Sequence, residues 1–153
     1  MRTFLLALLC AVFLLPCAYG KDIHKEKSLY RNILVKESNG LRCLVFTVKR
    51  GDRNQTCMDL SDPKRLVFPY VRMSFGGLLL NDNPSSILIV GLGGGSIPVT
   101  LTEMFPAAEI TIVEIDPAVL RVAERFFDFK ETQNMKVELC LLYTSPSPRD
   151  KRQ

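Results

Sequence analysis

The sequence ILIVGLGGGS, residues 87–96, decides the fold. Its first four residues are wholly apolar, which is typical of a strand buried on both faces of a parallel sheet. Glycines crowd the next five positions, and residues 96–105 then have a helical pattern with Pro106 just past their end. A strand that runs through a glycine-rich turn into a helix indicates the opening unit of a nucleotide-binding α/β sheet.

The same pattern continues downstream. Residues 110–113 form a second apolar run that ends at Glu114, and Asp116 before Pro117 predicts the start of another helix. Apolar residues at helical spacing follow, and alternation over residues 135–139 predicts a third strand. The order β-α-β-α-β is the first half of a doubly wound sheet. We therefore predict an α/β fold with a truncated Rossmann-like domain at residues 63–139.

Four residues carry the chemistry of this pattern: Gly91, Gly93, Gly95 and Glu114. Glycines let a ligand approach the backbone at a helix N-terminus. Glu114 follows Gly91 by 23 residues, and a carboxylate there can accept hydrogen bonds from the ribose hydroxyls of an adenosine-containing ligand. The alternating glycine spacing favours an S-adenosyl sulfonium over a nicotinamide dinucleotide, which usually goes with G-x-G-x-x-G. A tight structural turn beside a solvated glutamate is the alternative.

The preceding segment, residues 21–62, predicts a small antiparallel β domain. Residues 30–36, 41–48 and 55–60 read as three strands, because they are rich in apolar or β-branched residues and are separated by turn residues. We expect the polar stretch 21–27 to be mobile. From Pro69 onward the spacing predicts a helix.

Cys43 and Cys57 flank a turn-like stretch at residues 49–53. A turn centred on Arg50 would place them opposite each other on antiparallel strands, where a disulfide could contribute roughly 3 kcal/mol. Two small buried thiols are the alternative.

Residues 1–20 are typical of an export signal. A short basic start precedes 12 apolar residues, and small residues stand before Lys21, where we expect cleavage. Twelve residues rise about 18 Å in a helix, less than the roughly 30 Å of a bilayer core, so we expect no membrane anchor after cleavage. Pro16 argues against a lipoprotein site at Cys17. The mature chain is therefore expected to be periplasmic or secreted.

Residues 140–153 read as a non-native tail, because residues 140–150 resemble a translated sequencing adaptor. Four of the 20 Lys and Arg residues lie in the two ends, and so does one of the 16 acids, leaving residues 21–139 with a net charge of +1. The basic character is thus an end effect, and no nucleic-acid partner is expected.

Four motifs together resemble the spermidine synthase (polyamine aminopropyltransferase) family across residues 28–139: Ser28-x-Tyr30-x-x-Ile33, Phe68-x-Tyr70, the ILIVGLGGG run and VEIDP at 113–117. The resemblance implies a transferase that moves an aminopropyl group from decarboxylated S-adenosylmethionine to a diamine. It implies that Glu114 holds the ribose, that the glycine loop lies along the nucleoside and that Tyr70 faces the amine acceptor. It also implies catalytic acids beyond Leu139, small-molecule substrates, no metal and no tightly bound cofactor. We expect this truncated chain to be inactive and to fold poorly by itself.

Three positions depart from that family. Gly94 stands where an Asp usually contacts the donor, and Arg31 and Arg72 stand where the family has Gln and amine-binding residues. These changes suit a carboxylate-bearing ligand, so an S-adenosylmethionine-dependent methyltransferase is one alternative, and a non-catalytic exported nucleoside-binding domain is another. A homodimer is left open. His24 is expected to be solvent-exposed and not catalytic.

Overall fold

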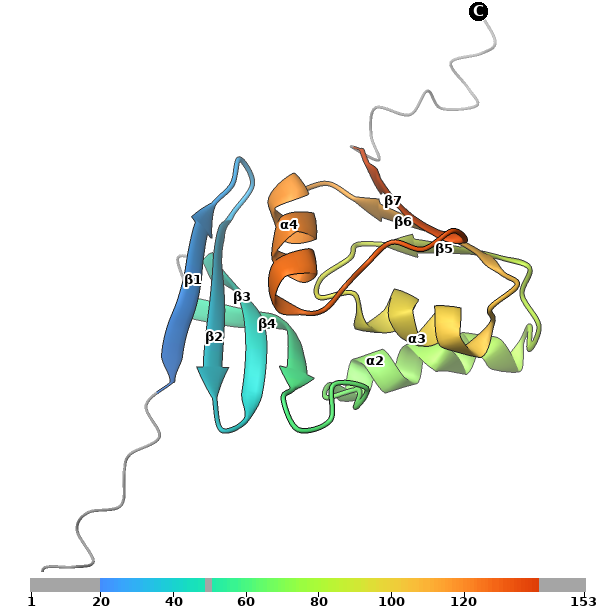
Figure 1. Cartoon of the computed structure of the whole chain (residues 1–153), viewed down its shortest axis with the longest axis horizontal. Coiled ribbons are helices and arrows are strands. Elements are labelled where there is room, and N and C mark those ends of the chain that lie inside the picture. The colour runs from blue at the N-terminus through green and yellow to red at the C-terminus, as the bar shows by residue number, and fades with distance from the viewer. Residues whose placement is uncertain (1–19, 49–50, 141–153) are drawn as a thin grey trace, which may run out of the picture.

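The computed structural model describes residues 20–48 and 51–140 of the 153-residue chain. The predicted export signal, apart from Gly20, and the adaptor-like tail, apart from Cys140, lie outside the described residues. Two sheets stand side by side, with helix α4 (Pro117–Phe126) between them (Figure 1). Within the described part of the chain, none of the helices has the length and apolarity that a membrane crossing requires.

The first sheet is antiparallel, in the order β1-β2-β3-β4. Its strands are β1 (Lys21–Lys27), β2 (Asn32–Ser38), β3 (Leu41–Val48) and β4 (Gly51–Asp59). The expectation of a mobile segment at residues 21–27 is wrong, because these residues pair with β2 along their whole length. Their polar composition suits an edge strand, where lysines discourage pairing with another chain.

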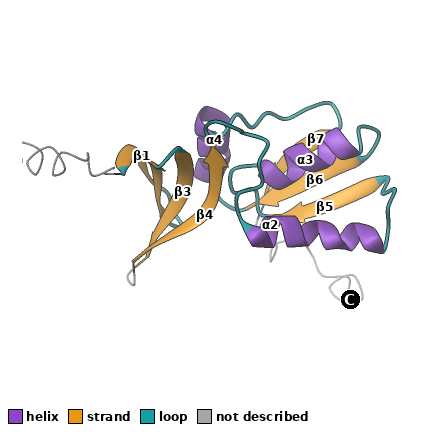
Figure 2. Ribbon diagram, turned by 90° about the horizontal axis from the view of Figure 1, so that it is seen from below, coloured by secondary structure: helices purple, strands orange, loops and turns teal. Residues whose placement is uncertain are grey.

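The second part begins with α2 (Pro69–Ser74) and the 3-10 turn η1 (Phe75–Leu79), in which the predicted helix tightens at its glycine pair. The parallel strands β5 (Ser86–Val90), β6 (Glu109–Glu114) and β7 (Met135–Leu139) follow, in the order β5-β6-β7. Helices α3 (Ser96–Met104) and α4 (Pro117–Phe126) connect them, as Figure 2 shows. The predicted β-α-β-α-β order is confirmed.

One face of the parallel sheet carries most of its buried side chains. In the parallel register Ile87 lies beside Ile110, and Ile89 beside Ile112, on the face that packs against α3 and α4. The opposite face carries Leu88 and Val90, which are 66% and 62% exposed. The expectation that this strand is buried on both faces is therefore wrong for the described residues. Two crossovers that advance in the same direction across a sheet put both helices on one face.

The core extends from one sheet to the other. Buried residues of β2 and β3 belong to the same cluster as the apolar face of α4 and the inner face of β6. Phe127 and Phe129, just after α4, are buried in this cluster as well. The antiparallel sheet therefore packs on α4, which holds it beside the C-terminal ends of the parallel strands.

Candidate functional site

The turn after β5 has the backbone that its glycines predict. Gly91, Gly93 and Gly95 all have positive φ, between 59° and 92°. The N–H of Gly91 donates to the Val113 carbonyl of β6 at 2.8 Å, which fixes the start of the turn at the carboxyl edge of the sheet. The turn thus presents its backbone at the edge where parallel α/β sheets bind ligands.

Gly94 and Gly95 face the protein interior. A Cβ on Gly94 would lie 2.6 Å from the Thr56 methyl carbon and 3.1 Å from the Phe127 ring. A Cβ on Gly95 would lie 2.4 Å from the ring of Phe129. An aspartate at position 94 would therefore require Thr56 on β4 and Phe127 after α4 to shift.

Glu114 ends β6 beside the glycine turn and is 7% exposed. Its Oε2 accepts a hydrogen bond from the Leu92 N–H at 2.9 Å. Its Oε1 accepts from the N–H groups of Ile115 at 2.8 Å and Asp116 at 2.9 Å. A carboxylate has about four lone-pair positions, so one position, on Oε2, stays open for a ligand hydroxyl.

Asp116 joins the two sheets. Its Oδ1 accepts from the Ala118 N–H at 2.9 Å, which is the predicted helix cap. Its Oδ2 lies 2.5 Å from the hydroxyl of Ser28, in the turn between β1 and β2. Ser28 belongs to a motif of the sequence, but this contact could not be predicted from it. The two partners are 88 residues apart, and no local pattern relates them.

These groups border a cavity of about 370 Å³ between the antiparallel sheet and the carboxyl edge of β5 and β6. It is lined by Gly91, Gly93 and Glu114, together with Tyr70 and Arg31. The Tyr70 hydroxyl donates to the Gln55 carbonyl at 2.8 Å, and burial raises the pKa of Tyr70 above its ordinary value. Tyr70 thus contributes a phenol ring to the cavity wall.

The two arginines that the sequence grouped together occupy different places. Arg31 lines the cavity, with its guanidinium carbon 5.0 Å from the centroid of the Phe46 ring. Arg72 does not line it; its Nη1 donates to the Leu66 carbonyl at 3.1 Å on an exposed side of α2. The expectation that both arginines suit a carboxylate-bearing ligand is therefore wrong for Arg72 in this cavity. Of the two arginines, Arg31 alone lines it.

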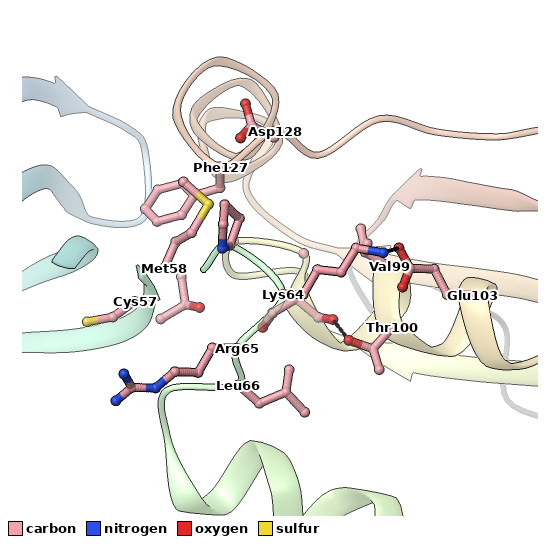
Figure 3. Close-up of a pocket in the computed structure, with 15 residues that line it drawn as sticks. Cys57, Met58, Lys64, Arg65, Leu66, Val99, Thr100, Glu103, Phe127 and Asp128 are labelled. Atoms are coloured by element: carbon pink, nitrogen blue, oxygen red, sulfur yellow. Dashed lines mark hydrogen bonds and ion pairs between the residues drawn. The ribbon is translucent and has the colours of Figure 1, made fainter. Parts of the chain in front are cut away.

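A second cavity, of about 190 Å³, lies on the other side of the glycine turn (Figure 3). Met58, Val99 and Phe127 supply apolar walls. At its rim Lys64 and Glu103 form an exposed ion pair with an N–O distance of 2.8 Å. Thr56 borders both cavities, so β4 and the glycine turn form the wall between them.

The cysteine pair and the histidine lie away from the carboxylate. Cys43 and Cys57 face each other on β3 and β4, and their sulfur atoms are bonded in the structure. His24 is only 21% exposed, so the expectation of a solvent-exposed ring is wrong. The centroid of its ring lies 4.9 Å from that of the Phe126 ring, because β1 covers the end of α4. Its Nε2 lies 3.2 Å from Oε2 of Glu26.

The chain has clear relatives, although no family model matches it. A polyamine aminopropyltransferase of Vibrio vulnificus is 51% identical over 137 residues, 87% of this chain and 45% of the relative. An eEF1A lysine and N-terminal methyltransferase of Xenopus laevis is 36% identical over 96 residues, 58% of this chain and 14% of the relative. The chain therefore spans less than half the length of either relative.

A solved structure has the same fold. The crystal structure of spermidine synthase from Thermotoga maritima superposes with a TM-score of 0.61 at 18% identity, over 79% of this chain and 41% of that one. This chain has an antiparallel N-terminal sheet followed by a Rossmann-like parallel sheet, as predicted from residues 21–139.

Proposed function

Since the chain is spermidine-synthase-like in sequence and fold, we propose that it is the N-terminal part of a transferase that binds an adenosyl co-substrate in the cavity beside Glu114. One observation carries the proposal: a buried carboxylate and a glycine turn meet at the carboxyl edge of a parallel sheet, with one acceptor position open on Glu114. The ribose lies at Glu114 and the rest of the nucleoside along Gly91 and Gly93. No tightly bound cofactor is needed.

The transfer is that of an aminopropyl group from decarboxylated S-adenosylmethionine to a polyamine. A neutral amine attacks the carbon next to the sulfonium, the carbon–sulfur bond breaks toward sulfur, and methylthioadenosine leaves. The amine must first lose a proton to a general base, which we place beyond Leu139. The name and 51% identity of the Vibrio vulnificus relative support this reaction.

Methyl transfer from S-adenosylmethionine is the second candidate. It is favoured by Gly94, which lacks the family's donor-binding aspartate and is closely packed against Thr56 and Phe127, and by the methyltransferase relatives. Its co-product is S-adenosylhomocysteine, so the two reactions are told apart by the nucleoside they release.

The binding proposal is tested by calorimetry with methylthioadenosine, whose adenosine and methylthio groups are present in both donors. We expect saturable binding, and a loss of at least about tenfold in affinity for Glu114→Ala, as one buried charge-assisted hydrogen bond contributes roughly 1.5–3 kcal/mol. Glu109→Ala is the matched control, because Glu109 is exposed at the opposite end of β6. Unchanged affinity in folded Glu114→Ala would remove the ribose role, and absence of binding by the parent chain would remove the proposal.

Two further proposals concern the setting. The mature chain starts at Lys21 outside the cytoplasm, which is tested by locating the processed protein after fractionation and sequencing its N-terminus. The substrates of the protein are small molecules, and it binds no nucleic acid. It acts either as a monomer or as a homodimer, and analytical sedimentation measures which of the two forms.

A further inference from the structure

The 370 Å³ cavity beside Glu114, here called the nucleoside cavity, is lined by one basic and two acidic side chains. Of the described residues that line it, three are charged: Arg31, Glu114 and Asp116. Glu114 accepts three backbone N–H bonds, and Asp116 accepts from the Ala118 N–H and lies beside the Ser28 hydroxyl. Arg31 forms no ion pair with any residue in the described ranges. The cavity therefore offers a ligand one guanidinium without an ion-pair partner among the described residues, beside two carboxylates that accept hydrogen bonds from neutral N–H and O–H groups.

Hydrogen bonds fix the backbone of Arg31. Its backbone N–H donates to the Ser28 hydroxyl oxygen at 3.0 Å, and its carbonyl accepts from the Ser28 N–H at 2.9 Å. Ser28 is in turn joined to Asp116 at the tip of β6. The guanidinium carbon lies 5.0 Å from the centroid of the Phe46 ring on β3. Arg31 is thus held at the cavity by contacts with Ser28 and Phe46, and Ser28 itself bonds to Asp116.

A planar guanidinium is suited to a carboxylate, which it can bind through two parallel hydrogen bonds. It repels an ammonium group, whereas the carboxylates of Glu114 and Asp116 in the same cavity attract one. We propose that Arg31 binds a carboxylate on a ligand in this cavity, carried either by the adenosyl donor or by the amine acceptor. Arg31 is then a specificity-determining residue that favours a carboxylate-bearing ligand. This inference rests on the proposed function only in placing an adenosyl ligand in the same cavity.

Two pairs of ligands, each differing mainly in a carboxylate, test the proposal on the full chain. The donor pair is S-adenosylmethionine and its decarboxylated form. The acceptor pair is 4-aminobutanoate and 1,4-diaminobutane, titrated in the presence of methylthioadenosine. In at least one pair we expect the carboxylate-bearing ligand to bind roughly tenfold more tightly, the effect of one charge-assisted hydrogen bond pair. The donor pair and the acceptor pair distinguish the two sources.

The preference must depend on Arg31. We expect Arg31→Gln to abolish it, Arg31→Lys to keep part of it, and Arg72→Gln, the matched control on α2, to leave it unchanged. No preference in either pair, or a preference that survives Arg31→Gln, would overturn the inference. Methylthioadenosine has no carboxylate, so its affinity for Arg31→Gln should stay within about twofold of the parent value. Failure of the parent chain to bind methylthioadenosine defeats the proposed function, whereas a lost carboxylate preference alone defeats only the role of Arg31.

Discussion

The side-chain carboxylate of Glu114, at the C-terminal end of β6, accepts hydrogen bonds from three backbone N–H groups. These bonds stabilise the strand end and the turn at Leu92 before any ligand arrives. They also limit what the carboxylate can bind, because Oε1 is fully engaged and Oε2 has one acceptor position left. A position that the sequence marks as functional is therefore also structural.

This geometry predicts an asymmetry between the two ribose hydroxyls. We expect removal of one hydroxyl, in either the 2′-deoxy or the 3′-deoxy form of methylthioadenosine, to cost roughly tenfold in affinity, and removal of the other to cost much less. Calorimetry with both analogues measures this. Equal large losses would mean that Glu114 releases a backbone bond when the ligand binds.

Gly95 is the least replaceable residue of the turn. Its φ of +81° and the 2.4 Å approach of a Cβ to the Phe129 ring both act against a side chain. We expect Gly95→Ala to lower the free energy of unfolding by about 2–4 kcal/mol, from left-handed strain and overpacking together. Gly76→Ala is the matched control, since a Cβ there meets no atom within 4 Å. Urea unfolding compares the two, and equal costs would contradict the packing argument.

At the scale of elements, β4 does the most to build the site. It carries Gln55 and Thr56 to the nucleoside cavity, Met58 to the second cavity and Cys57 to the disulfide. Its last residue, Asp59, accepts from the N–H and hydroxyl of Ser61 at 2.9 and 2.6 Å and from Arg65 at 2.8 Å. Asp59 therefore anchors the chain where it leaves the antiparallel sheet.

The Asp59 anchor predicts a pH dependence. The hydrogen bonds from Ser61, and then the charge of Arg65, hold the pKa of Asp59 below its ordinary value. A carboxyl whose pKa is lower in the folded state stabilises the fold above its unfolded pKa of about 3.9, and this contribution is lost as the pH falls through the folded pKa. We expect Asp59→Asn to lower the thermal midpoint at pH 7, and the difference from the parent chain to shrink toward pH 3. A difference that does not change with pH would contradict this, and exposed Asp82→Asn is the control.

At the scale of the whole molecule, α4 joins two sheets into one core. The cluster runs from β2 and β3 through α4 to the inner face of β6, so the cavity walls from both sheets keep their relative position. The other face of the parallel sheet has no comparable cover among the described residues, since Leu88 and Val90 are exposed. Poor folding of this chain by itself stays a prediction, and a sharp cooperative thermal transition of residues 21–139 would count against it.

The two faces of the parallel sheet differ in burial, so we predict that shortening a side chain lowers the free energy of unfolding by different amounts on the two faces. We expect Leu88→Ala to lower the free energy of unfolding by less than about 1 kcal/mol, because the side chain is 66% exposed. Ile112→Ala, on the buried face of β6, should cost about 2–5 kcal/mol. Denaturant titration of both variants measures this, and similar costs would show that another segment covers Leu88.

The order of helices and strands, the glycine turn and the position of Glu114 could all be predicted from residues 87–139, because local periodicity and turn chemistry record them directly. Three features depended on tertiary structure: the pairing of polar β1, the exposed face of β5, and the separation of Arg31 from Arg72. Each is decided by which distant segment packs beside the residue. Ser28 and Asp116 are 88 residues apart, and their contact, next to Arg31, exists because both sheets pack on α4.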